Sequence, residues 1–66
     1  MDEEFNLSMR KFLKQVGVTS QKAIEDAMAD LPPEKRGTLI SARATLTVDG
    51  VDLTHVVEGQ IRAPSE

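Results

Sequence analysis

His55 is the only histidine of the chain and the only side chain expected to titrate near neutral pH. A histidine can act as a pH-sensitive or ligand-facing group, although an isolated one more often satisfies a single hydrogen bond at the edge of a core. The chain has no cysteine and no second histidine to complete a metal-binding set. We therefore predict no metal site and keep His55 as a candidate interaction residue.

Ser20, Asp52 and His55 together have the residue types of a nucleophile, an acid and a base. A working triad also needs a sharp nucleophile turn, an oxyanion hole and a cleft. The sequence has no Gly-x-Ser-x-Gly turn, and its 66 residues are too few to wall a cleft. Helix capping is the better role for Ser20, so we predict no enzymatic activity, no catalytic residue and no cofactor.

Arg10, Lys11 and Lys14 form a compact basic cluster that could dock an acidic partner or a nucleotide phosphate. Such a cluster also occurs on solvated helix faces, and no glycine-rich phosphate loop accompanies it here. The formal net charge of −3 argues against a general affinity for the phosphate backbone of nucleic acid. These three residues are therefore candidates for contact with a protein partner.

The stretch 17–20, between two helical patterns, has the residue types found in the turn of helix-turn-helix DNA readers. A DNA-binding regulator that uses residues 7–31 is therefore one alternative function. In that arrangement the second helix would present three carboxylates and only one lysine to DNA, which disfavours nucleic acid as a partner. The second alternative is a small-ligand carrier with its site near His55.

Apolar residues between positions 5 and 16 recur at helical spacing, which predicts a first helix over 5–16. The apolar face of this helix consists of Phe5, Met9, Phe12, Leu13 and Val16. Gly17 can adopt the left-handed conformation that closes a helix, with Val18 folding back onto the last turn. The first helix is therefore expected to end at Gly17.

A second helix is predicted over 20–31, because Thr19 or Ser20 can cap it and its apolar residues again share one face. This second face consists of Ala23, Ile24, Ala27, Met28 and Leu31. Pro32 and Pro33 disfavour helical backbone at the residue before each of them. The helix is therefore expected to stop at about Leu31 and to be followed by a stiff, polar connection.

The Asp49-Gly50 pair, flanked by alternating β-branched residues, predicts a two-residue turn in a hairpin over 42–61. In this register the pairs on the apolar face are Val48 with Val51, Leu46 with Leu53, Ala44 with His55, and Ala42 with Val57. The other face is polar apart from Val56 and consists of Arg43, Thr45, Thr47, Asp52, Thr54, Glu58 and Gln60. A sheet of this kind has one side on a core and one side toward water.

These elements predict a single α+β domain over residues 1–66, with two N-terminal helices followed by an antiparallel β-hairpin in the order α-α-β-β. An isolated two-stranded sheet is marginally stable in water, and a chain of this length buries only about 60% of its unfolded surface. Because no disulfide is available, we predict a homodimer that completes the fold. The stiff residues Pro32 and Pro33 make exchange of hairpins between protomers an alternative form of this dimer.

The N-terminal residues and the hydropathy of the chain indicate its cellular setting. Asp2, Glu3 and Glu4 follow Met1, which is the reverse of the basic start of a secretory signal. No stretch approaches the roughly 18 consecutive apolar residues of a transmembrane helix, so no membrane span is predicted. The absence of cysteine is compatible with a reducing compartment, and we expect a cytoplasmic protein.

The segments 5–13 (FNLSMRKFL), 16–21 (VGVTSQ) and 51–57 (VDLTHVV) together resemble a family of short uncharacterised bacterial proteins. This resemblance extends over most of the chain. It implies a compact bacterial domain and adds no activity, cofactor or site residue. The function expected from the sequence is therefore that of a small non-enzymatic dimeric interaction or regulatory protein, with a protein partner that the sequence does not identify.

Overall fold

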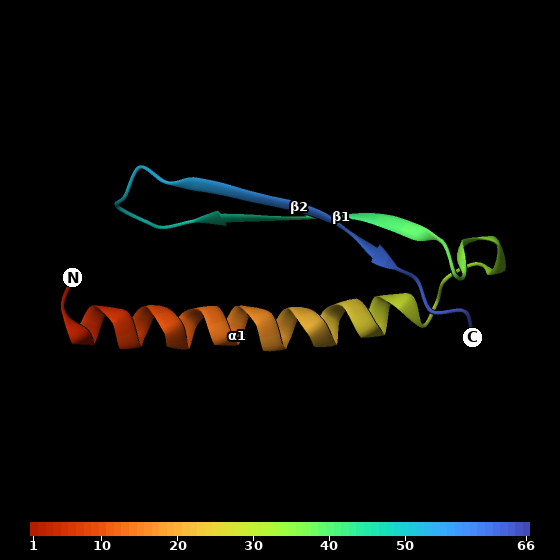
Figure 1. Cartoon of the computed structure of the whole chain (residues 1–66), viewed down its shortest axis with the longest axis horizontal. Coiled ribbons are helices and arrows are strands. Elements are labelled where there is room, and N and C mark those ends of the chain that lie inside the picture. Colours follow the sequence, from red (N-terminus) through yellow and green to blue (C-terminus); the bar gives the residue numbers. More distant parts are fainter. The chain divides into compact units, whose positions relative to one another are not determined.

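The computed structural model describes all residues from 1 to 66 and is α+β, with one long helix followed by an antiparallel β-hairpin (Figure 1). The elements are α1 (Glu3–Met28), the short 3₁₀ helix η1 (Pro33–Lys35), β1 (Leu39–Thr47) and β2 (Thr54–Arg62). The chain divides into two compact units, Met1–Leu31 and Pro32–Glu66, where the sequence predicts one domain. The first unit contains α1 and the second contains the hairpin.

The start of α1 follows from the first few residues. Asp2 has extended backbone, and its side-chain carboxylate accepts a hydrogen bond from the backbone N–H of Phe5 at 2.7 Å. Glu3 and Glu4 occupy the first turn, where negative charge is favourable to the helix dipole. The helix ends at Met28 rather than at the predicted Leu31.

The prediction of two N-terminal helices is wrong, because α1 continues without interruption through residues 17–20. Gly17 is not among the glycines with positive φ, so it does not form the left-handed helix stop. Thr19 does not cap a second helix, since its Oγ1 donates to the backbone carbonyl of Gln15 at 2.8 Å within the same helix. One glycine in a helix interior costs about 1 kcal/mol, whereas an interruption would leave unpaired backbone groups at two new helix ends.

Replacing Gly17 with alanine is expected to raise the free energy of unfolding by roughly 0.5–1 kcal/mol. Alanine loses less backbone freedom than glycine in a helix, and a Cβ at this position would meet no atom within 4 Å. Urea denaturation followed by far-UV circular dichroism measures the change. A lower stability of Gly17→Ala would contradict the continuous helix, because alanine is disfavoured where a helix stop needs positive φ.

The strands β1 and β2 pair along their whole length as a two-stranded antiparallel sheet. They begin three residues earlier and end one residue later than the predicted limits 42–61. The predicted pairing is wrong by two residues, since Leu46 lies opposite His55 rather than opposite Leu53. A shift of two residues keeps every side chain on its predicted face, because the faces of a strand alternate with a period of two.

The turn geometry explains the shifted register. A turn does occur at positions 49 and 50, and Gly50 has a φ of +78°. A two-residue type I′ hairpin turn needs positive φ at both central residues, and Asp49 does not have it. The two strands are therefore joined by a longer loop over residues 48–53.

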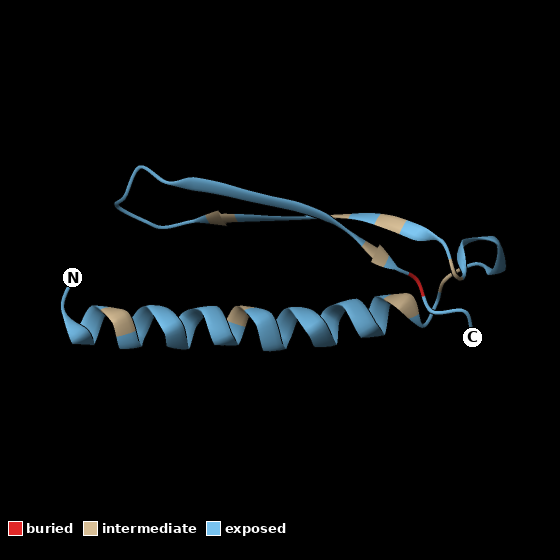
Figure 2. Ribbon diagram, in the orientation of Figure 1, coloured by how far each residue is buried: buried red, intermediate tan, exposed pale blue.

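The open end of the hairpin is closed by the residues that follow β2. The Ala63 N–H donates to the carbonyl of Thr38 at 2.8 Å, and the Gly37 N–H donates to the carbonyl of Pro64 at 3.1 Å. The Arg62 guanidinium adds a hydrogen bond from Nη1 to the carbonyl of Gly37 at 2.9 Å. Ala63 is 2% exposed and is the one buried residue of the chain, coloured red in Figure 2. Packing in the hairpin unit is therefore concentrated at this end.

Candidate functional site

The continuous helix joins the two predicted apolar faces into one stripe along α1. Positions at helical spacing extend this stripe from the first turn to the last. The positions, here called the apolar stripe, are Phe5, Met9, Phe12, Leu13, Val16, Ser20, Ala23, Ile24 and Ala27. At 1.5 Å per residue the apolar stripe is about 33 Å long. Of the residues predicted for the second face, Met28 is the half-buried last residue of α1 and lies outside the apolar stripe, and Leu31 lies beyond the end of the helix.

The large side chains of the apolar stripe are substantially exposed. The exposed fractions are 43% for Phe5, 39% for Met9, 50% for Phe12, 47% for Leu13 and 40% for Ile24. No residue of α1 is buried, and Figure 2 shows no red along the helix. Val16, at the midpoint of the stripe, is half-buried. A row of exposed apolar side chains of this kind is typical of a protein contact surface.

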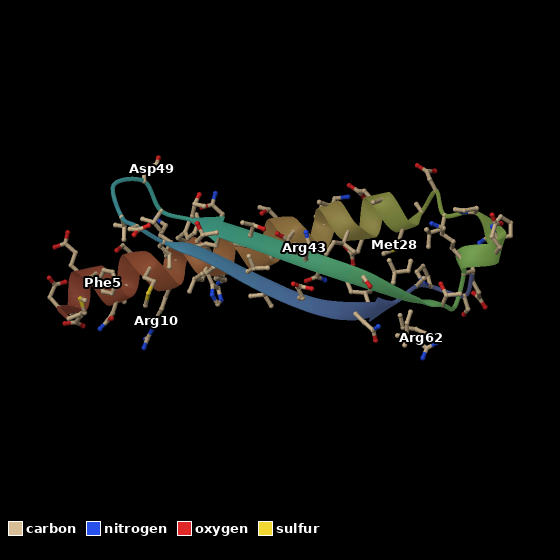
Figure 3. All side chains as sticks on the ribbon, turned by 90° about the horizontal axis from the view of Figure 1, so that it is seen from above. Phe5, Arg10, Met28, Arg43, Asp49 and Arg62 are labelled. Carbon is tan, nitrogen blue, oxygen red and sulfur yellow. The ribbon has the colours of Figure 1, made fainter.

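The basic cluster of Arg10, Lys11 and Lys14 lies on the side of α1 away from the apolar stripe, and all three residues are exposed. Figure 3 shows the Arg10 side chain extending away from the ribbon. The helix also carries an ion pair between Lys22 Nζ and Asp26 Oδ1 at 2.9 Å, with side chains 74% and 64% exposed. The three predicted residues therefore form a solvated charged surface. No helix of the chain combines the length and the apolar character needed to cross a membrane.

The predicted helix-turn-helix over 7–31 does not form, because residues 17–20 are helical. No turn sets a second helix at the angle with which such readers enter the major groove. The DNA-binding alternative therefore loses the structural feature on which it was based.

His55 is the second residue of β2 and lies on the hairpin face that also carries Leu46 and Val57. It is opposite Leu46 rather than opposite Ala44, the partner that the sequence predicts. His55 is exposed and takes part in none of the side-chain hydrogen bonds or ion pairs of the chain. No neighbouring group therefore orients its imidazole.

The other two residues of the triad pattern lie in elements of different kinds. Ser20 is in the interior of α1, so it is not the helix cap that the sequence predicts. Asp52 lies in the loop that joins the two strands. Neither residue has the sharp turn or the hydrogen-bonded base that activates a nucleophile. No group of three or more His, Asp or Glu side chains is arranged as a metal-binding set.

The hairpin has a polar face, as the sequence predicts, and an apolar tip. On the polar face Arg43 lies directly opposite Glu58, so opposite charges face each other across the strand pair. The loop at the tip, where Figure 3 labels Asp49, exposes the further apolar side chains Val48, Val51 and Leu53. The helix and the hairpin thus each present apolar side chains to solvent.

A family model described as a family of unknown function (DUF6494) matches residues 1–64, a range that includes α1 and both strands. The chain belongs to this family. Neither a curated protein nor a solved structure matches the chain. Membership of DUF6494 confirms the predicted resemblance to a family of unknown function, and the match spans the helical unit and the hairpin unit together.

The feature that sequence reasoning missed is the full length of the apolar stripe. The signal is present in the sequence, because positions 5, 9, 12, 16, 20, 23 and 27 keep helical spacing on both sides of Gly17. Interpreting Gly17 as a helix stop divides this pattern into two short faces. Uninterrupted periodicity was therefore the better guide than the local stop signal.

Proposed function

We propose that this member of DUF6494 is a non-enzymatic interaction protein whose working form is a homodimer. The observation that carries the proposal is the apolar stripe of α1, whose large side chains are 39% to 50% exposed. A helix with one apolar side gains most of its stability by packing that side against another apolar surface. A partner surface therefore belongs to the stable state of the protein.

The hairpin unit supports the same proposal. A two-stranded sheet is marginally stable in water, and Ala63 is the one buried residue of this unit. Both outer edges of the sheet carry unpaired backbone groups, since the sheet contains only β1 and β2. Association with a second copy is a common source of stability for small domains without disulfides.

The surroundings of His55 support the non-enzymatic part of the proposal. A general base must lie within hydrogen-bonding reach of the group that it deprotonates, and a third group usually orients it. His55 is exposed and has no such orienting hydrogen bond. Its position on the hairpin suits a surface contact better than proton transfer.

The proposed setting is the cytoplasm, with which a chain that lacks cysteine is compatible. There the dimer acts as an interaction or regulatory protein toward a protein partner. The basic cluster of Arg10, Lys11 and Lys14 is suited to an acidic partner surface. Because these residues lie away from the apolar stripe, they stay accessible when the stripe is covered.

Light scattering tests the proposed homodimer directly. At tens of micromolar protein the expected mass is twice the 7.2 kDa of the chain. Dilution is expected to lower the helical circular dichroism signal together with the mass, because the folded state is linked to association. A side-by-side dimer and a dimer with exchanged hairpins have the same mass, so the measurement tests both forms. A monomeric mass with full helicity at every concentration contradicts the proposal.

A further inference from the structure

The apolar stripe of α1 has large side chains in its N-terminal half and mostly small ones in its C-terminal half. Val16 lies at its midpoint. The pairs of positions equidistant from Val16 are Phe5 with Ala27, Met9 with Ala23, and Phe12 with Ser20, at eleven, seven and four residues. Each of these large residues thus has a small counterpart at the same distance on the other side of the midpoint.

We infer that α1 packs against α1 of a second copy in the antiparallel direction, with the two-fold axis beside Val16. This arrangement sets Phe5, Met9 and Phe12 against Ala27, Ala23 and Ser20 of the partner subunit, so the two helices keep an even separation along about 33 Å. Leu13 and Ile24 lie at one edge of the apolar stripe and are not matched in this way. It is self-complementary, as an interface across a two-fold axis must be. The inference rests on the proposed homodimer and names the surface and the orientation through which the dimer forms.

A parallel pair of the same helices would pack less well. Phe5 would meet Phe5 of the partner subunit at one end, and Ala27 would meet Ala27 of the partner subunit at the other. The two ends would then require different separations of the helix axes, and space left between the small side chains destabilises a core through lost contacts. The size gradient along the stripe therefore selects the antiparallel direction.

The polarity of the stripe also permits the pairing. No charged residue occupies any of its positions, so covering it buries no unpaired charge. Ser20 is its one polar side chain, and a serine in a helix can donate to the carbonyl four residues earlier when it is covered. The pairing thus requires no polar group from the second copy.

Single cysteines test the orientation, because the chain has no cysteine of its own. In Val16→Cys the two thiols meet beside the axis, so mild oxidation is expected to shift the protein from monomer to covalent dimer on a non-reducing gel. In Ala27→Cys the thiols lie at opposite ends of the pair, about 33 Å apart, and no covalent dimer is expected. When Met9→Cys and Ala23→Cys chains are mixed, a disulfide between the two different chains is expected.

Val18→Cys is the matched control, because Val18 is in the same helix but outside the apolar stripe, and no covalent dimer is expected from it. A covalent dimer from Ala27→Cys would establish a parallel pair and overturn the inference. A dimeric mass by light scattering without a covalent dimer from Val16→Cys would overturn the helix pairing and leave the proposed homodimer standing. A monomeric mass would overturn both.

Discussion

Phe12→Asp is expected to abolish the homodimer and most of the helical circular dichroism signal at tens of micromolar protein. Phe12 is an exposed aromatic side chain within the apolar stripe of α1. In the inferred pair it packs on Ser20 of the partner subunit. Its replacement removes at most about 1.5–3 kcal/mol of apolar burial per copy and places an unpaired carboxylate in an apolar contact. Light scattering and circular dichroism on the same samples measure the two losses together.

Val18→Asp is the control for this substitution. Val18 lies six residues further along α1, is 59% exposed and is not part of the apolar stripe. Valine and aspartate have similar, modest helix propensities, so the change adds a charge with little effect on the helix itself. The homodimer is expected to survive in this variant. Equal loss of the dimer in both variants would show that added charge alone disrupts the protein, and a dimeric Phe12→Asp would contradict the inferred pairing.

Periodicity in the sequence predicts which helical side chains share a side better than it predicts where a helix ends. The residues from Phe5 to Ala27, which the sequence predicts on two separate faces, belong to one helix. Gly17 misled the prediction because a glycine can end a helix, whereas here it is an interior residue. Keeping one glycine costs about 1 kcal/mol, and starting a second helix would require several residues to be fixed before the first new hydrogen bond forms. The continuous helix is the less costly arrangement.

In the hairpin, local sequence patterns likewise predict the faces of the strands and the position of the turn but do not predict the register. Alternation of apolar and polar residues places each strand residue on its correct face, and the Asp49-Gly50 pair locates the turn. The register depends instead on the φ angle of Asp49, which is not positive. Because the pairing shifts by two residues, each side chain stays on its predicted face, while the partner of His55 changes from Ala44 to Leu46.

The sequence does not predict how the candidate site residues, chosen for their chemistry, lie relative to one another. It does predict which residues share the apolar stripe. His55 and the basic cluster of Arg10, Lys11 and Lys14 occur in different elements, and spacing along the sequence does not bring residues of separate elements together. The stripe lies within a single helix, so one local period determines all of its positions. The sequence therefore predicts both halves of the surface that supports the proposed function. The homodimer itself stays a prediction.

Val18→Pro is expected to lower the free energy of unfolding by about 3 kcal/mol or more and to abolish the homodimer. Proline removes a backbone N–H from the interior of α1, and its ring clashes with the carbonyl four residues earlier. The kink would fall beside Val16, so the two halves of the apolar stripe would no longer lie along one line. Two helices separated at Gly17 would tolerate this proline, since proline is common just after a glycine helix stop. Urea denaturation and light scattering distinguish the two cases.

Glu3→Pro is the backbone control for this experiment, because the first helical position has no partner for its N–H within the helix. It is expected to keep both the stability and the dimeric mass of the unmodified protein. Val18→Asp completes the comparison, since it changes the same side chain as Val18→Pro without removing a backbone donor. A Val18→Pro variant as stable as Glu3→Pro would mean that the helix is interrupted beside Gly17. The positions on the two sides of Val16 would then not lie on one continuous helix. The inferred pairing with a second copy would therefore be wrong.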